Sequence, residues 1–311
     1  MVSKTEAGKK PAVKLEHVSK KIGRRMIIDD LSFEIYGGEV FGFLGPNGAG
    51  KTTTIRMIVG LMRMTKGNIY INGHSVKGEF KQAMRRVGAI VENPEMYKFL
   101  TGYQNLIHYA RMVPGITKQR VDEVVRLVKL EDAIKMKVRK YSLGMRQRLG
   151  VAQALLHRPS VLILDEPTNG LDPQGIHDLR NYLRELARKE RVAVVVSSHL
   201  LSEMQLMCDR IGIIQSGKLI GVKTVDEFVN GATTGKARFT VDDPRAAALA
   251  VREKLSLQAT ADDEAIEVAI PREKIPVVVD TLVESQVKIY GVAAVTKSLE
   301  DRFLEVTGVK E

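Results

Sequence analysis

The sequence of 311 residues contains one cysteine, Cys208, and therefore cannot form an intramolecular disulfide. A lone thiol fits a reducing compartment. No apolar run approaches the roughly 20 residues needed to span a bilayer, and the N-terminal segment lacks the apolar core of a signal peptide. These absences predict a chain that stays in the cytoplasm.

Internal repeats and low-complexity blocks are also missing, and the content of 44% hydrophobic and 27% charged residues is that of an ordinary globular protein. The net charge of +11 is unevenly distributed. Residues 236–311 carry 11 Lys/Arg against 14 Asp/Glu, so the first 235 residues hold +14. This positive field suits nucleotides, nucleic acids or anionic membrane surfaces, and solvated cations that favour solubility explain it equally well.

Strand and helix patterns predict the domain organisation. Residues 1–12 are polar and are expected to form a loose tail. Residues 13–221 alternate apolar strands with helices, which predicts an α/β domain with a mostly parallel core sheet, and helices dominate residues 92–156. A Gly/Thr-rich linker over 222–235 leads to a small α+β domain of βαββαβ type over 236–311, which ends in a C-terminal helix.

The segment GPNGAGKT at 45–52 matches the phosphate-loop pattern and lies between an apolar strand and a helix, as that motif requires. Its glycines allow a tight turn whose backbone amides converge on phosphate oxygens, while Lys51 reaches the terminal phosphates and the Thr52 hydroxyl coordinates magnesium. The alternative is a Gly-rich turn without a ligand. The residues expected to hold the phosphates are Gly45, Asn47, Gly48, Ala49, Gly50, Lys51, Thr52 and Thr53.

Polar side chains end two further apolar strands. Asp165 and Glu166 follow VLIL, and His199 follows VAVVVSS. Parallel sheets bind ligands at the carboxyl ends of their strands, so we expect Asp165 to hold magnesium and Glu166 to activate water. We expect His199 to meet the γ-phosphate. The alternatives are an acidic pair that caps a helix and a structural histidine.

Together with YSLGM at 141–145 and GLD at 170–172, these motifs make residues 13–221 resemble the ATP-binding subunit of an ABC transporter. The resemblance implies a P-loop NTPase fold with antiparallel β and helical subdomains, ATP and Mg²⁺ as ligands, and a head-to-tail dimer of identical or related subunits. It also implies that Ser142 and Gly144, in the position of the family's signature turn, and Asp172 contact nucleotide held by the partner subunit. Ser142 is equally suited to cap the helix that follows it.

Three positions depart from the commonest family pattern. YSLGM lacks the first signature glycine and has Met145 in place of glutamine, and Glu92 replaces a glutamine that touches magnesium. Ile22 stands where many relatives stack an aromatic ring on adenine, so weaker adenine binding is expected. These variants and the C-terminal extension resemble the branch of bacitracin- and lantibiotic-type drug exporters.

The resemblance implies an ATP hydrolase that powers export of a drug, peptide or lipid-like substrate. It would be held on the cytoplasmic face of the membrane by a separately encoded permease that docks on residues 93–106. The alternative for any single residue there is an ordinary exposed loop and helix. One alternative is a soluble ABC ATPase acting on ribosomes or nucleic acid. That class predicts paired cassettes, a long coiled coil or an aromatic-rich surface, and the sequence has none of them, so no nucleic acid partner is expected. A second alternative, a non-enzymatic adaptor, is disfavoured by Lys51, Asp165 and Glu166.

Overall fold

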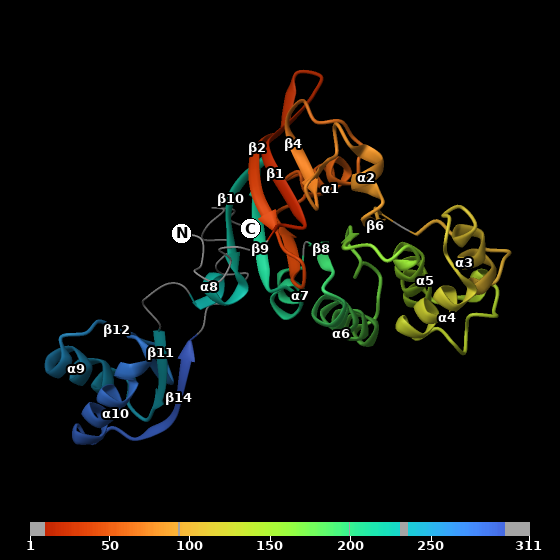
Figure 1. The fold of residues 1–311 in the computed structure, drawn as a ribbon. Helices are drawn as coiled ribbons and strands as arrows, with labels where there is room; N and C mark the ends of the chain where they lie inside the picture. Colours follow the sequence, from red (N-terminus) through yellow and green to blue (C-terminus); the bar gives the residue numbers. More distant parts are fainter. Residues whose placement is uncertain (1–9, 93, 199, 231–235, 296–311) are drawn as a thin grey trace. The chain divides into compact units, whose positions relative to one another are not determined.

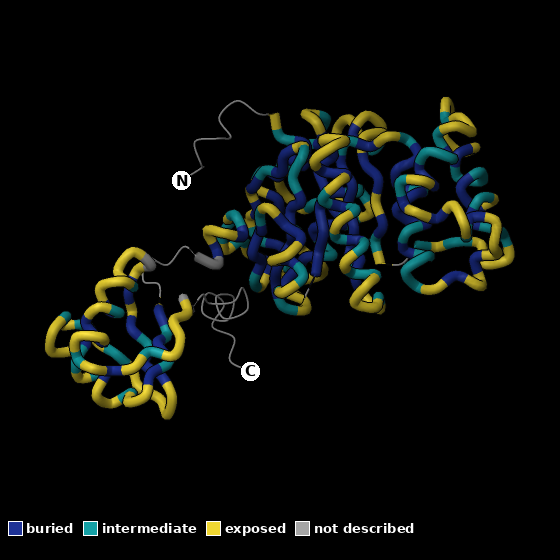
Figure 2. Tube along the Cα trace, turned by 90° about the horizontal axis from the view of Figure 1, so that it is seen from below, coloured by how far each residue is buried: buried dark blue, intermediate teal, exposed yellow. Residues whose placement is uncertain are grey.

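The computed structural model describes residues 10–92, 94–198, 200–230 and 236–295. Contacts between Cα atoms divide the chain into two compact units, Met1–Thr224 and Val225–Glu311. Each unit has its own buried interior, shown in dark blue in Figure 2. Among the described residues, every helix is too short or too polar to cross a lipid bilayer.

A six-stranded sheet forms the centre of the first unit (Figure 1). Its strands pair in parallel except at one edge, where β10 runs antiparallel to β9. Every residue of β3 is buried, because helices or the second sheet cover this layer on both faces. In spatial order the strands are β10 (Lys218–Thr224), β9 (Arg210–Gln215), β3 (Val40–Leu44), β8 (Ala193–Ser198), β7 (Val161–Leu164) and β6 (Val87–Ile90).

An antiparallel sheet shares its core with this central sheet. The ring of Phe33 stacks on Phe41 of β3 with centroids 5.7 Å apart and meets Phe43 edge-on at 5.5 Å. The stacking fixes the antiparallel sheet beside the strand that leads into the phosphate loop. Its spatial order is β2 (Arg25–Ile35), β1 (Val13–Ile22), β4 (Lys66–Ile71) and β5 (His74–Ser75).

Helices α3, α4 and α5 lie together beyond β6 in Figure 1, as the sequence predicts for residues 92–156. A capping box in which Thr101 and Gln104 each accept from the other's backbone N–H starts α3, and Thr117 caps α4. The helices of the first unit are α1 (Lys51–Ile58), α2 (Phe80–Met84), α3 (Gly102–Ala110), α4 (Lys118–Leu127), the 3₁₀ turn η1 (Val138–Lys140), α5 (Leu143–Leu155), α6 (Pro173–Glu190) and α7 (Leu201–Met207).

The second unit contains a four-stranded antiparallel sheet in the order β12, β13, β11, β14, with a helix in each crossover. This is the βαββαβ pattern that the sequence predicts. Its core includes Phe239 of β11 and Leu282 of α10, both fully buried. The elements are α8 (Val225–Asn230), β11 (Lys236–Val241), α9 (Pro244–Leu255), β12 (Ala259–Ala261), β13 (Ala265–Ala269), η2 (Arg272–Lys274), α10 (Ile275–Glu284) and β14 (Ile289–Val295).

The predicted linker differs from the structure in its first part. Residues 222–230 form the end of β10 and helix α8, because Val225 and Phe228 recur at helical spacing and are both buried. The rest of the predicted linker, most of the N-terminal tail and the predicted C-terminal helix lie outside the described residues. The exact domain bounds therefore stay a prediction.

Candidate functional site

The phosphate loop connects β3 to α1 and depends on its glycines for space and conformation. A Cβ on Gly45 would lie 2.2 Å from the backbone oxygen of Ile214, so only glycine fits there. Gly48 and Gly50 have φ values of 76° and 110°, a region open mainly to glycine. The resulting turn ends on the first turn of α1, where unpaired amides and the helix dipole favour an anion.

Lys51 begins α1 and is only 6% exposed. Its ammonium donates hydrogen bonds to the backbone oxygens of Gly45 at 2.7 Å and Pro46 at 3.3 Å. Burial lowers the pKa of Lys51, and the carboxylates of Glu166 and Asp165 act in the opposite direction. A buried cation in this position offers a strong, poorly screened attraction to phosphate.

Asp165 connects three elements at the carboxyl ends of the strands. This carboxylate follows β7, is 4% exposed, and accepts hydrogen bonds from Ser197 Oγ of β8 at 2.6 Å and Thr52 Oγ1 of α1 at 3.3 Å. The Glu166 backbone N–H donates to the same Ser197 hydroxyl at 2.9 Å, and Glu166 has a left-handed φ of 49°. Ser197 thus orients both acidic residues, a role that the sequence did not reveal although the strand end was expected here.

The donor set at this point fits Mg²⁺. Thr52 and Asp165 present a hydroxyl and a carboxylate to one another, and oxygen is the ligand that this hard cation prefers. No group of three His, Cys, Asp or Glu side chains that could hold a metal occurs in the described part of the chain. The site thus matches ions that are held by one or two protein oxygens and completed by water and phosphate, which is the usual mode of Mg²⁺.

Glu92 lies close to this region but has a partner of its own. Its carboxylate pairs with the guanidinium of Arg56, and its backbone has a left-handed φ of 69°. Arg56 follows Thr52 by four residues on α1, so the two side chains share a face of the helix. The structure therefore pairs Glu92 with a residue one helical turn after Thr52 on α1, and Arg56 is a neighbour that no motif indicated.

The signature-like turn forms the N-terminus of α5. The Ser142 hydroxyl accepts from the Met145 backbone N–H at 3.2 Å, so Ser142 does cap the helix. Asp172 caps α6 in the same way, accepting from Gly175 N–H at 2.9 Å. Within the described part of the chain, no hydrogen bond or ion pair joins Ser142 or Asp172 to the phosphate loop.

Comparison with known proteins identifies the family. A family model described as ABC transporter matches residues 28–169. The uncharacterised ABC transporter ATP-binding protein YhcH of Bacillus subtilis (strain 168) is 57% identical over 300 residues, which cover 96% of this chain and 97% of that protein. The chain belongs to the ATP-binding proteins of ABC transporters.

Two further similarities extend this result. The bacitracin transport ATP-binding protein BcrA of Bacillus licheniformis is 46% identical over 208 residues, 67% of this chain and 68% of that protein. This confirms the predicted resemblance to bacitracin-type exporters. A dimeric ATP-binding cassette solved in a post-hydrolysis state with ADP and phosphate is 25% identical with a TM-score of 0.61, over 68% of this chain and 98% of that one. The predicted ABC-type P-loop fold is confirmed.

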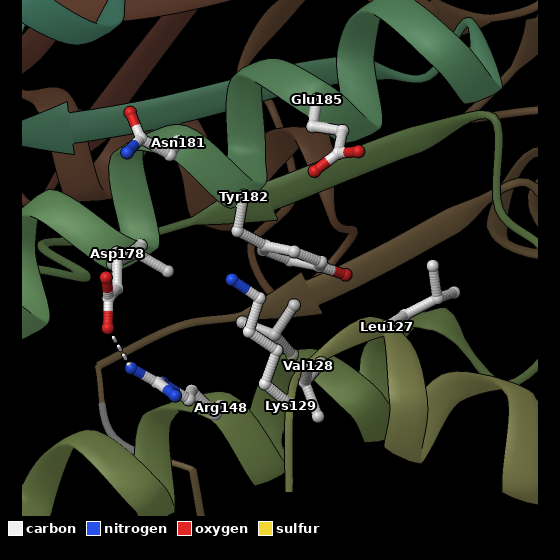
Figure 3. A pocket seen from close by; sticks show the side chains of 10 residues that line it. Leu127, Val128, Lys129, Arg148, Asp178, Asn181, Tyr182 and Glu185 are labelled. Atoms are coloured by element: carbon white, nitrogen blue, oxygen red, sulfur yellow. Dashed lines mark hydrogen bonds and ion pairs between the residues drawn. The ribbon is translucent and has the colours of Figure 1, made fainter.

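In this ABC ATP-binding protein, α5 is tied to α6 by an ion pair. Arg148 donates to Asp178 at 2.7 Å, drawn as the dashed line in Figure 3. Beside it lies a cavity of about 90 Å³, where Lys129 and Glu185 add one charge of each sign. The Tyr182 hydroxyl is buried there without a hydrogen-bond partner in the described structure. The ion pair couples the helix of the signature-like turn to the helix that Asp172 starts.

The remaining predicted site residues lie around the phosphate loop or outside the described residues. Asn47 is exposed, Ala49 is buried with its amide bonded to Pro46 O at 3.1 Å, and Thr53 is partly buried in α1. Ile22 ends β1 with half of its surface exposed, so it is free to contact a ligand. His199 lies outside the described residues, and its predicted contact with the γ-phosphate stays a prediction.

Proposed function

We propose that this protein is the ATP-hydrolysing subunit of an ABC exporter. The observation that carries the proposal is the convergence of Thr52, Asp165 and Ser197 beside the buried Lys51. A loop that only connected a strand to a helix would not require a buried cation, a buried carboxylate and a hydroxyl hydrogen-bonded to that carboxylate at one edge of the sheet. Such groups are costly to bury unless they serve a ligand or a reaction.

Each of these groups has a distinct role in the proposed reaction. The phosphate-loop amides and Lys51 bind and neutralise the β- and γ-phosphates, while Thr52 and Asp165 orient Mg²⁺, which supplies electrostatic stabilisation of the transferred phosphoryl group. The Glu166 carboxylate accepts a proton from the attacking water. Ser197 fixes the Glu166 backbone, and Glu92 reaches the metal site after leaving Arg56.

The second half of the site comes from another subunit. Ser142, Gly144 and Asp172 are not bonded to their own phosphate loop, and the dimeric cassette with ADP and phosphate supports a facing arrangement. Either a homodimer or a pair of related subunits satisfies this geometry. ATP binding would close the dimer and hydrolysis would reopen it, so that chemistry resets the conformational cycle.

Docking to a permease would occur in a cleft between the end of α1 and the helical region. This docking cleft has a volume of about 640 Å³ and is lined mainly by apolar side chains, including Leu61, Val91 and Tyr109. Leu61 is 69% exposed, and Phe99 of the segment 93–106 is 67% exposed, so both large apolar side chains are accessible to a partner. The protein would therefore sit on the cytoplasmic face of the membrane, bound through its permease.

The exporter class rests on the relatives. BcrA is named for bacitracin transport, and we extend this to export of a drug, peptide or lipid-like substrate by the present protein. The second unit lacks a catalytic cluster among its described residues, so regulation or support of the dimer is the role proposed for it. Ile22 would contact adenine but has no aromatic ring on which the base could stack. This predicts modest discrimination between ATP and GTP.

The test is Glu166→Gln, which keeps the shape of the side chain and removes the proton acceptor. We expect ATP to bind with unchanged affinity, hydrolysis to fall by at least about 100-fold, and a stable dimer to elute on size-exclusion chromatography with MgATP. Glu131→Gln is a matched amide control at an exposed carboxylate outside the phosphate loop. Hydrolysis at the normal rate by Glu166→Gln would overturn the role of Glu166, and copurification with ribosomes or nucleic acid instead of a membrane protein would overturn transport.

A further inference from the structure

A second, larger groove adjoins the docking cleft. It has a volume of about 980 Å³ and runs between α2, the loop at 113–117 and the C-terminal end of α5. Met84 and Val87 line both this groove and the docking cleft, so the two depressions lie side by side. The site motifs do not involve this groove.

The charges that line the groove are all of one sign. Four cationic side chains face it, and its lining contains no Asp or Glu. Arg120 and Arg158 share the carboxylate of Glu123 at 2.9 Å and 2.8 Å, which leaves this wall with excess positive charge. Lys81 and Arg85 on α2 are exposed and have no ion pair within the described structure.

The excess charge of the groove comes from its lysine and arginine side chains, and the cavity of Figure 3 differs from it. Burial lowers the pKa of His157, which also lines it, so the imidazole adds no charge at neutral pH. The small cavity of Figure 3 balances Lys129 and Arg148 with Asp178 and Glu185. In the groove, by contrast, Arg120 and Arg158 pair with Glu123, whereas Lys81 and Arg85 have no acidic partner in the described structure.

The floor of the groove is apolar. Val87 and Leu156 are buried, Met84 and Ile116 are partly buried, and Phe80 at the rim is 48% exposed. An apolar floor between cationic walls matches an amphipathic helix or strand with acidic residues along its edges. A flat lipid surface is a poorer match, because the apolar side chains line a hollow instead of projecting from a convex face.

We propose that this groove binds an acidic, amphipathic segment of the permease, as a continuation of the docking cleft. The inference rests on the proposed function, since it requires a membrane partner at that cleft. The apolar side of the segment covers Phe80, Met84 and Ile116, and its carboxylates pair with Lys81 and Arg85. Electrostatic complementarity of this kind sets the partner's identity and orientation and accelerates its association.

The experiment measures binding of a fluorescein-labelled amphipathic peptide, with leucines on one face and glutamates beside them, to the full chain by fluorescence anisotropy. The double variant Lys81→Glu/Arg85→Glu should weaken binding by at least about tenfold. The matched control Arg63→Glu/Lys66→Glu changes the net charge equally at exposed residues outside the groove and should bind as the unmodified chain does. Raising the salt concentration should weaken binding to the unmodified chain.

Three results would overturn the proposal: no binding of the glutamate peptide, equal loss in the groove and control variants, or equally tight binding of a lysine counterpart. Selective binding to phosphatidylglycerol vesicles, lost in the groove variant while the peptide fails to bind, would assign the groove to lipid instead. ATP affinity and circular dichroism show whether each variant is folded. If Lys81→Glu/Arg85→Glu does not fold, Lys81→Gln/Arg85→Gln is measured in its place. The formation of a stable Glu166→Gln dimer with MgATP does not depend on the groove. This measurement therefore distinguishes a failure of the proposed ATPase function from a failure of the groove proposal.

Discussion

Gly144 offers a test in which stability and activity should change in opposite directions. A Cβ at this position would lie 3.6 Å from Leu171 Cδ2 and 3.9 Å from Ser142 Oγ, both ordinary contacts. Gly144 lies in the first turn of α5, and replacing a helical glycine by alanine reduces the backbone entropy lost on folding. We expect Gly144→Ala to raise the free energy of unfolding by about 0.5 kcal/mol, the lower end of the helix-interior range.

Activity should nevertheless fall. In the proposed dimer the signature-like turn approaches nucleotide bound by the partner, and a methyl group there occupies space that the closed dimer requires. A misfit of about 1.4 kcal/mol in the closed state lowers hydrolysis about tenfold. Urea denaturation followed by circular dichroism gives the stability, nucleotide titration at low protein concentration gives the affinity of the single chain, and phosphate release gives the rate.

Mixing with a second variant tests whether the turn acts on the partner's nucleotide. Lys51→Ala removes the phosphate-loop cation and should be nearly inactive alone, whereas Gly144→Ala alone should keep about a tenth of the activity. In a mixed dimer both lesions meet in one site, which leaves the other site with intact Lys51 and Gly144. Activity should therefore return on mixing, provided that tagged subunits are shown to exchange in the same sample. Exchange without recovered activity would refute the facing arrangement, and full activity of Gly144→Ala alone would refute the role of the turn.

Two further predictions concern buried hydroxyls. Ser197→Ala removes the acceptor of the partly buried Glu166 N–H and leaves the Thr52 hydroxyl as the side-chain donor to Asp165. The free energy of unfolding should therefore fall by about 1–3 kcal/mol and half-maximal hydrolysis should need more Mg²⁺; unchanged values for both would disprove the positioning role. Tyr182→Phe removes a buried hydroxyl that has no partner and should raise the free energy of unfolding by about 1 kcal/mol in urea denaturation, whereas a decrease would reveal a bound water.

Features of the fold that depend on a few consecutive residues could be predicted from the sequence. The phosphate loop, the strand VLIL before Asp165 and the cap at Ser142 each depend on a few consecutive residues with fixed conformational preferences. The convergence of Lys51 and Asp165 also followed, since parallel strands bring their carboxyl ends to one edge. Glycine at Gly45 and Gly48 was required for the same reason, by the shape of one turn.

Contacts between distant residues were not predictable in this way. Ser197 and Asp165 are 32 residues apart, and Arg56 and Glu92 are 36 apart. A serine at a strand end and an arginine on an amphipathic helix are common, and their partners depend on strand order and helix rotation. Helix α8 was missed because its six residues give too short a pattern to stand out beside a Gly/Thr-rich segment.

The cationic groove shows why charge totals do not locate a binding surface. The excess of +14 over the first 235 residues predicted a positive field, and the phosphate loop was the obvious place for it. Lys51, however, is a single buried cation, so most of the excess positive charge must lie elsewhere on the chain. Lys81, Arg120 and Arg158 come from separate segments and meet only in the folded chain. Among the cations that line the groove proposed for the permease, Lys81 and Arg85 are exposed and have no ion pair in the described structure, so this fold favours an acidic partner segment.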